Sequence, residues 1–216
     1  MSLKLINGLF YYEHDLELDN EALIKEITTT RENPGSDLDD SRPSHKDVDM
    51  QHTFYEDVPL KQQTFSLISK QVGKVLDDIF NLKTAMNIQE IWGHFTPPGE
   101  QTMIHNHFEK NTRGLSWVYY PHMPENAGNL IFQCQVDTQR IMWEINSTAG
   151  KIYFFSRDIL HFVTRNASNE NRISISGNVT TGSELNIILN NDHQFTNNYW
   201  YFVGRDGERI VPKDEK

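Results

Sequence analysis

The stretch NRISISGNVT, residues 171–180, alternates polar and apolar side chains. Residues two apart in a β-strand face the same side of the sheet. Arg172, Ser174 and Ser176 therefore share one face, and isoleucines occupy the other. An arginine and two hydroxyls facing a protein interior are costly without a ligand, and a carboxylate ligand resolves that cost because guanidinium binds it bidentately. A solvated face, with the arginine paired to an acidic residue, fits this strand equally well.

The same period of two extends outward from about residue 86 to residue 182. In GLSWVYY, residues 114–120, Trp117 and Tyr119 fall on one face, and Val118 and Tyr120 on the other. Further short strands, separated by Asn, Gly, Pro or Ser turns, are predicted for NLIFQCQV, RIMWEI, KIYFFS and HFVTR, and YWYFVGRDGERIV predicts a hairpin. Many short strands at regular spacing are typical of a sandwich or barrel.

The first third of the chain has a different pattern. Apolar residues recur at helical spacing in residues 20–31 and 60–82. The helical stripe predicted for the second segment is Phe65, Leu67, Ile68, Val72, Val75, Leu76 and Ile79. Residues 33–53 form a long polar connection, and loops of this length are uncommon unless they carry function. We expect either a lid over the site or a plain connection.

Helices followed by a run of strands predict a mostly β protein, a jelly roll with N-terminal helices packed on its outside. The length of 216 residues suits one domain. We divide it into helical support with its loop over residues 1–85, a β core over 86–182, and a C-terminal extension with a hairpin over 183–216.

Composition narrows the function classes. The chain has 30 acidic and 20 basic residues and a net charge of −10, which disfavours a nucleic-acid partner. Cys134 is the single cysteine, so neither an intrachain disulfide nor a cysteine zinc cluster can form. No apolar run approaches the ~18 residues of a membrane span, and the N-terminus lacks the pattern of a secretory signal. We therefore expect a cytoplasmic protein, in which the glycosylation-like triplets at Asn146, Asn166 and Asn178 are incidental.

The segment TMIHNHFEKN, residues 102–111, contains a candidate metal site. On a strand, His105, His107 and Glu109 share a face, and the two histidines can ligate one ion. An H-x-H motif alone fits an ordinary polar strand face as well. Of the other histidines, His161 has the strongest claim, because it begins a strand just after the apolar strand that Gly150 opens.

Arg172 follows His161 by eleven residues, so a third histidine and an arginine fall on consecutive strands. Together with His105 and His107, they describe a metal beside a carboxylate pocket. Four other side chains, Trp92, His94, Trp117 and Trp143, can line a cavity or fill the core, and the core fits any single one better.

From PPGEQTMIHNH through LSWVYY and GKIYFFSRDILHFV to NRISISGN, about residues 92–180, the chain resembles the iron(II)- and 2-oxoglutarate-dependent oxygenases. It looks most like the phage and bacterial relatives of the prolyl hydroxylases. The resemblance implies a double-stranded β-helix fold, Fe(II) and 2-oxoglutarate as cofactors, and O2 as cosubstrate. It also implies His105, His107 and His161 as the metal ligands.

The resemblance assigns the cosubstrate contacts as well. Arg172, with Ser174, would bind the far carboxylate of 2-oxoglutarate, and Tyr120 would hydrogen-bond the same group. Tyr119 would then point outward, although one residue of register would exchange the two tyrosines.

The third ligand departs from the family pattern. The family at large uses H-x-D or H-x-E, whereas the aligned residue here is His107; the pair His107 and Glu109 would restore a carboxylate. We prefer His105 and His107, because Gly99 stands where the phage and bacterial subgroup has a glycine before its first histidine. Glu109 then supports the ligands or faces the substrate. A neutral third ligand leaves the iron site one unit more positive.

The resemblance implies hydroxylation of a substrate, and kinship with prolyl hydroxylases favours a peptidyl residue such as proline over a small molecule. Two alternatives stay open. A three-histidine cupin-type dioxygenase uses O2 without 2-oxoglutarate and needs no inward arginine, and a non-catalytic jelly-roll module would hold a metal or a sugar. The sequence selects neither a substrate nor an oligomeric state.

Overall fold

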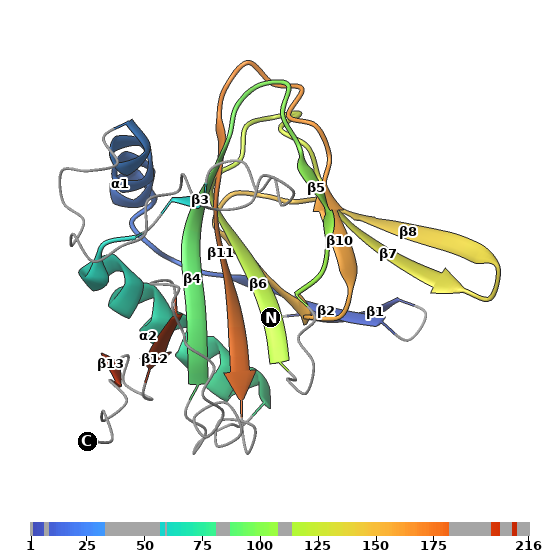
Figure 1. Cartoon of the computed structure of the whole chain (residues 1–216), viewed down its shortest axis with the longest axis horizontal. Helices are drawn as coiled ribbons and strands as arrows, with labels where there is room; N and C mark the ends of the chain where they lie inside the picture. Colours follow the sequence, from blue (N-terminus) through green and yellow to red (C-terminus); the bar gives the residue numbers. More distant parts are fainter. Residues whose placement is uncertain are drawn as a thin grey trace, which may run out of the picture.

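The computed structural model describes residues 2–6, 9–32, 57–58, 60–80, 87–107, 114–181, 200–203 and 209–210. Its elements form two antiparallel sheets that face each other, with two helices against the outer face of the larger one (Figure 1). The helices are α1 (Asn20–Glu32) and α2 (Gln62–Phe80). The strands are β1 (Ser2–Ile6), β2 (Leu9–Asp15), β3 (Asp57–Val58), β4 (Asn87–Thr96), β5 (Thr102–His105), β6 (Gly114–His122), β7 (Leu130–Val136), β8 (Gln139–Ile145), β9 (Lys151–Ser156), β10 (Leu160–Val163), β11 (Arg172–Thr181), β12 (Trp200–Val203) and β13 (Arg209–Ile210).

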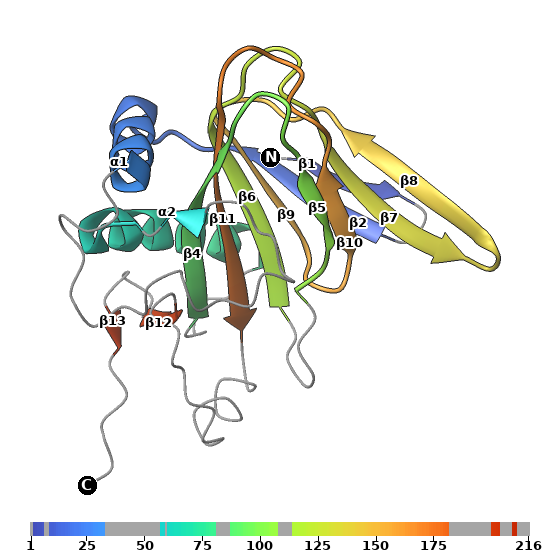
Figure 2. The same cartoon turned by 45° about the horizontal axis from the view of Figure 1, so that its top comes forward.

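The larger sheet follows the order β1-β2-β9-β6-β11-β4-β12-β13, with β3 paired to β4. The smaller sheet follows the order β5-β10-β7-β8. Along the chain, β5 lies in the smaller sheet, β6 in the larger, β7 and β8 in the smaller, β9 in the larger and β10 in the smaller, so the chain crosses repeatedly between two sheets that enclose a common interior. Figure 2 shows β5 and β10 lying opposite β6 and β11. The expected jelly roll with helices outside is confirmed.

The helices cover one face of the larger sheet. Asp19 caps α1, because its Oδ1 accepts a hydrogen bond of 3.0 Å from the Ala22 N–H. Leu23 and Ile27 of α1 are buried against the sheet. The approach is close at Gly93 of β4, where an added Cβ would lie 2.9 Å from the Ile27 side chain.

Helix α2 is tied to α1 by one carboxylate. Glu26 accepts hydrogen bonds from the Lys61 N–H at 2.7 Å and the Thr64 hydroxyl at 2.6 Å, and so satisfies donors at the start of α2. The buried residues of α2 are Phe65, Ile68, Val72, Val75 and Leu76. The prediction for Leu67 was wrong: it is 49% exposed, because it lies on the solvent side of the helix.

A second core fills the space between the sheets. It contains Val118 and Tyr120 of β6, Phe132 of β7, Phe155 of β9 and Val163 of β10. Trp117 and Tyr119, the alternate residues of β6, pack in the helix-side core instead. The predicted alternation of GLSWVYY is therefore observed, and both faces of the larger sheet are buried.

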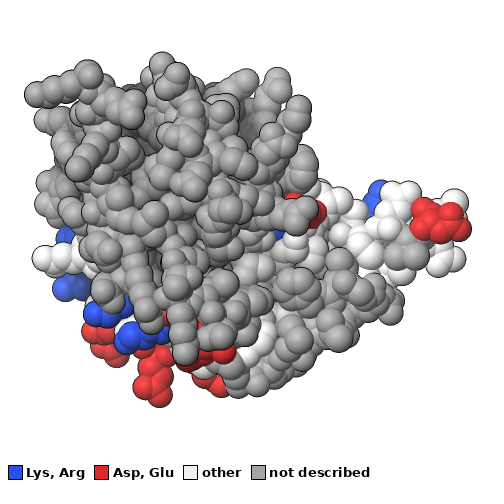
Figure 3. All heavy atoms as spheres, turned by 90° about the horizontal axis from the view of Figure 1, so that it is seen from below, with Lys and Arg blue, Asp and Glu red and all other residues white. Residues whose placement is uncertain are grey.

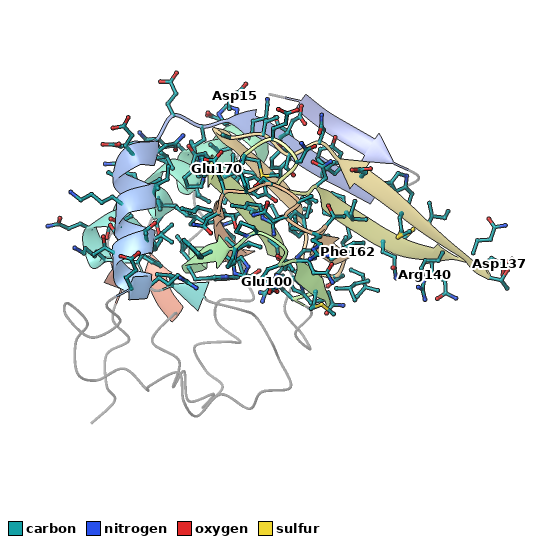
Figure 4. All side chains as sticks on the ribbon, turned by 90° about the horizontal axis from the view of Figure 1, so that it is seen from above. Asp15, Glu100, Asp137, Arg140, Phe162 and Glu170 are labelled. Atoms are coloured by element: carbon teal, nitrogen blue, oxygen red, sulfur yellow. The ribbon has the colours of Figure 1, made fainter. Side chains whose placement is uncertain are left out.

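Two hairpins, β1–β2 and β7–β8, add to what the sequence predicted. The β1–β2 hairpin was not anticipated, although Asn7-Gly8 between two apolar segments is a hairpin signal. The β7–β8 hairpin projects from the body, with Asp137 at its tip (Figures 3 and 4). Strands β12 and β13 pair as the predicted C-terminal hairpin requires.

Loop 33–53 lies outside the described residues. Neither helix in the described chain has the length and apolar character needed to cross a membrane.

Candidate metal centre and anion pocket

Three histidines meet between the two sheets. His105 ends β5, and its backbone register partner on β10 is His161. His107 lies two residues beyond β5, where its N–H donates to the Arg157 carbonyl at 2.9 Å in the turn between β9 and β10. Ring centroids lie 4.2 to 5.2 Å apart. One ligand atom from each ring lies within 4.8 Å of the others, so the three residues form a group that could hold a metal ion.

Backbone carbonyls orient two of the rings. His105 Nδ1 lies 2.7 Å from the Met103 carbonyl, and His161 Nδ1 lies 2.9 Å from the Ile159 carbonyl. A carbonyl only accepts hydrogen bonds, so each Nδ1 carries the proton and each Nε2 carries the lone pair. This arrangement is common among metal-ligating histidines, since the outer hydrogen bond fixes both tautomer and ring orientation.

The surroundings keep two of the rings neutral. Burial, with smaller contributions from His105 and Arg157, lowers the pKa of His107 to about 3. Burial also holds the pKa of His161 well below its usual value, and the neighbouring His105 and His107 add to the effect. A metal needs the unprotonated nitrogen, so these shifts favour a ligating form at neutral pH.

Arg172 lies in the same interior and is 1% exposed. Its Nη1 donates to the carbonyls of Ala127 at 2.6 Å and Thr164 at 3.1 Å. Its Nη2 lies 3.2 Å from the Thr96 hydroxyl and 3.5 Å from that of Thr102. All of these acceptors are neutral, and no carboxylate of the described residues pairs with the guanidinium. Burial lowers the pKa of Arg172, which expresses the cost of holding this charge without an anion.

The contacts of Arg172 depend on the loops at one end of the sheets. Gly128 has a φ of +91°, and a Cβ there would lie 2.2 Å from the Thr164 carbonyl oxygen, so only glycine permits this approach. Asn166, which is fully buried, donates to the carbonyls of Thr96 and Glu170. The Asn166 side chain therefore helps to hold the β10–β11 loop in place.

Tyr120 supplies an unsatisfied hydroxyl beside Arg172. The side chain is 0% exposed, and its hydroxyl has no hydrogen-bond partner among the described residues. The nearby Ser147 hydroxyl is engaged with the Leu130 N–H and the Ile145 carbonyl. Burial raises the pKa of Tyr120, and the Arg172 charge and, to a smaller extent, the Ser147 hydroxyl offset part of that rise, although the Tyr120–Ser147 contact falls outside hydrogen-bond geometry. Within the described part of the chain, a buried O–H without a hydrogen-bond partner interacts electrostatically with a guanidinium that has no carboxylate partner, and the two form a donor set suited to a carboxylate.

Tyr119 has a different role, because it faces the helices. Its hydroxyl donates to Asn20 Oδ1 at 2.6 Å and lies 3.2 Å from the Leu16 carbonyl. The register predicted from the sequence, with Tyr120 inward and Tyr119 on the opposite face, is the one observed.

One pocket connects the histidines to this end of the sheets. It encloses ≈ 520 Å³ including its open mouth, and Tyr120, Ser174, Ser176 and Thr102 line it together with the three histidines. Trp92 and His94 also line the pocket, and Trp117 both lines it and belongs to the helix-side core, whereas Trp143 packs against the core between the sheets. Glu109, the alternative ligand, lies outside the described residues.

Sequence reasoning missed several residues of the site. Thr96 of β4 faces Arg172 across the strands, and Asn178 continues the alternation of Arg172, Ser174 and Ser176. The period of two contained the signal for Asn178. The partners from loops, such as Ala127 and Thr164, gave no signal, because backbone carbonyls are common to all residues.

No protein-family model matches the chain, and no match was found among the curated proteins. Solved structures match in fold. A prolyl-4-hydroxylase from Pseudomonas putida has a TM-score of 0.55 at 15% identity, over 79% of this chain and 92% of that one. The alpha-ketoglutarate-dependent carbocyclase SnoK of nogalamycin biosynthesis also has a TM-score of 0.55, at 11% identity and 79% of each chain. The epimerase SnoN, solved with Fe3+ and alpha ketoglutarate, has a TM-score of 0.54 at 11% identity, over 79% of this chain and 78% of that one.

Proposed function

We propose that this protein is an iron(II)- and 2-oxoglutarate-dependent oxygenase. The fold it shares with a prolyl-4-hydroxylase and with two alpha-ketoglutarate-dependent enzymes supports this class. The observation that carries the proposal is that the three histidines line one pocket with Tyr120 and Thr102, and that the Thr102 hydroxyl lies 3.5 Å from Nη2 of the buried Arg172. Three histidine nitrogens can hold the metal, and a guanidinium and a tyrosine hydroxyl can hold a carboxylate, since among the described residues the first has no carboxylate partner and the second no hydrogen-bond partner.

His105, His107 and His161 would hold Fe(II), leaving positions open for the cosubstrate. When bound, iron with 2-oxoglutarate and O2 supplies the oxidising chemistry. Arg172 and Tyr120 would bind and orient the far carboxylate, and Ser174 would add a hydrogen bond from the same face of β11. The apolar walls would exclude water from the reaction; they include Phe155, whose ring centroid lies 4.7 Å from that of His161.

The two alternatives predict different pockets. A three-histidine dioxygenase that does not use 2-oxoglutarate has no need for a buried guanidinium, and a metal- or sugar-binding jelly roll has no need for one either. Arg172 is buried beside neutral acceptors at a cost that an anion would offset. This single feature favours the oxygenase.

The decisive experiment is an anaerobic titration of the Fe(II)-loaded protein with 2-oxoglutarate, read by the visible charge-transfer band of a bidentate keto-acid chelate. We expect the band in the wild type. We expect it to be lost in Arg172→Ala and to require more 2-oxoglutarate in Tyr120→Phe. Since Arg172 also bonds two carbonyls, Arg172→Ala costs stability, and Tyr120→Phe is the cleaner variant. Iron binding without a band would favour the three-histidine alternatives, and no iron binding would refute the proposal.

The finer assignment is hydroxylation of a peptidyl residue such as proline. It rests on the resemblance to prolyl hydroxylases, and two of the structural neighbours are prolyl-4-hydroxylases. The carbocyclase and epimerase neighbours show that the same fold serves other reactions. We expect proline-containing peptides to gain one oxygen atom, measured by mass spectrometry, together with stoichiometric succinate. Succinate formation without peptide oxidation would leave the cofactor assignment intact and remove the peptide assignment.

A further inference from the structure

His107 differs from the other two histidines in what its outer nitrogen meets. His105 and His161 each place Nδ1 against a backbone carbonyl. His107 Nδ1 instead lies 3.5 Å from the side-chain amide nitrogen of Asn178. In the oxygenases that the chain resembles, a carboxylate residue stands at the position of His107. The one ligand that departs from the family pattern is therefore also the one whose outer nitrogen faces a side chain.

Asn178 is firmly placed. It lies in the middle of β11, is 3% exposed, and has Ser116 of β6 as its backbone register partner. The Ser116 hydroxyl, on a side chain that is 1% exposed, donates to Asn178 Oδ1 at 2.7 Å. The amide therefore belongs to the rigid centre of the larger sheet, and it reaches across the interior to a histidine at the end of the smaller one. Its burial within a strand also excludes Asn178 as a glycosylation acceptor.

The donor and acceptor pattern sets the position of the histidine proton. While the amide nitrogen faces it, His107 Nδ1 can only accept, which corresponds to a neutral ring with its proton on Nε2. Metal ligation through Nε2 requires the opposite tautomer, with the proton on Nδ1. A half turn of the amide exchanges Oδ1 and Nδ2 with little change in heavy-atom positions. The Ser116 hydroxyl can accept as well as donate, so its hydrogen bond survives the turn.

We propose that Asn178, held by Ser116, is the positioning residue of His107. With metal bound, Asn178 Oδ1 accepts a hydrogen bond from His107 Nδ1–H and so presents Nε2 to the ion. The ring stays neutral throughout, and only the location of its proton changes. Ligation to a cation makes the Nδ1–H a stronger donor, so the 3.5 Å contact shortens. The inference rests on the proposed metal site and adds a reason why a histidine can serve there.

One strand would then support both ends of the pocket. Arg172 begins β11 at the anion end, and Asn178 follows on the same face at the metal end. Because β11 pairs with both β4 and β6, the two functional ends have a fixed separation.

The test uses the full chain and Zn(II), a diamagnetic ion suited to three histidines. Long-range proton–nitrogen NMR correlations of ¹⁵N-labelled protein report the tautomer of each histidine directly. We expect zinc-loaded wild type to show the Nδ1–H form at His107 and a shifted Asn178 amide signal. Zinc affinity, measured by competition with a chelating dye, should fall about 10- to 100-fold in Asn178→Leu.

Two further variants make the result specific. Asn178→Asp keeps an acceptor for both His107 Nδ1–H and the Ser116 hydroxyl, so it should retain the tautomer and the zinc affinity. Ser116→Ala should weaken zinc binding less than Asn178→Leu does, because it only frees the amide. Ser69→Ala is the matched control: Ser69 is also 1% exposed but lies in α2, beyond the other face of the sheet, and it should leave zinc affinity unchanged.

The outcomes separate the two proposals. If wild-type protein binds no zinc, the metal site itself fails. If zinc binds while His107 keeps its proton on Nε2, or if Asn178→Leu binds zinc as tightly as wild type, the positioning role of Asn178 is wrong and the metal site stands. Should Asn178→Leu fail to fold, the wild-type tautomer and the affinity of Ser116→Ala decide the question.

Discussion

The two faces of strand β11 differ in kind although they share one backbone. On the helix side, Ile173, Ile175 and Val179 are at most 3% exposed and pack against other apolar residues. On the side of the smaller sheet, Arg172 and Asn178 are equally buried but make polar contacts. Neighbouring β6 repeats the contrast, with Tyr119 satisfied at the helices and the Tyr120 hydroxyl orphaned in the pocket.

This contrast separates stability from function. The helix-facing side is closed and apolar, so its residues contribute by burial. The pocket-facing side holds a charge and a hydroxyl that the described chain does not fully satisfy, which is an unfavourable arrangement unless a ligand completes it. Substitutions on the first face should therefore change the free energy of unfolding, and substitutions on the second should change ligand affinity.

The largest expected effect is on the helix side. Ile175→Ala removes a fully buried side chain and should lower the free energy of unfolding by about 2–5 kcal/mol. Urea unfolding monitored by circular dichroism measures it. The affinity for 2-oxoglutarate should stay within twofold of wild type under conditions where the variant is folded. A large loss of affinity at full folding would show that the two faces are not independent.

The second prediction concerns pH. His107 has a pKa of about 3 in the folded protein against 6.5 for an ordinary histidine, so below pH 6.5 the unfolded chain binds the extra proton. Stability contributed by the neutral ring is present above pH 6.5 and is lost as pH falls towards 3, by about 1.4 kcal/mol per pH unit. Unfolding free energies of metal-free protein across this range should fall less steeply in His107→Gln. Equal slopes of unfolding free energy against pH in wild type and His107→Gln would contradict the lowered pKa of His107.

The paired tyrosines give the sharpest comparison. Tyr119→Phe loses hydrogen bonds to Asn20 and the Leu16 carbonyl and should destabilise the fold by about 1 kcal/mol, with unchanged 2-oxoglutarate binding. Tyr120→Phe removes a hydroxyl that has no hydrogen-bond partner among the described residues, so stability should not fall, while 2-oxoglutarate affinity should drop about tenfold. Thermal melts with and without 2-oxoglutarate measure both. The reverse pattern would exchange the roles of the two faces.

The smallest effect is expected at Ser174, which lines the pocket beside His94. Ser174→Ala should change the unfolding free energy by less than about 0.5 kcal/mol and reduce 2-oxoglutarate affinity a few-fold, since one neutral hydrogen bond contributes about 1 kcal/mol. Isothermal titration of the metal-loaded protein is sensitive enough. No change in affinity would remove Ser174 from the proposed cosubstrate contacts.

Much of the fold could be predicted from periodicity, because successive residues of a strand face opposite sides of the sheet and leave a period of two in the sequence. The strands from β6 to β11 and both helices lie close to their predicted ranges. The β1–β2 hairpin was not predicted, although its Asn7-Gly8 turn is visible in the sequence. Leu67 was misplaced because a helical stripe tolerates an extra apolar residue at its edge.

For the site, the sequence alone determined the donors: two histidines around Asn106, a third before Arg172, and an alternation that placed a charge and hydroxyls on one face of a strand. Tertiary structure decided which of these donors meet. The pairing of β5 with β10 places His105 opposite His161, and the turn at Arg157 holds His107 beside them. The carbonyls around Arg172 and the amide facing His107 come from strands and loops far apart in the chain. Sequence periodicity reports only which side of its own strand a residue faces, whereas a binding site depends on which strands face one another.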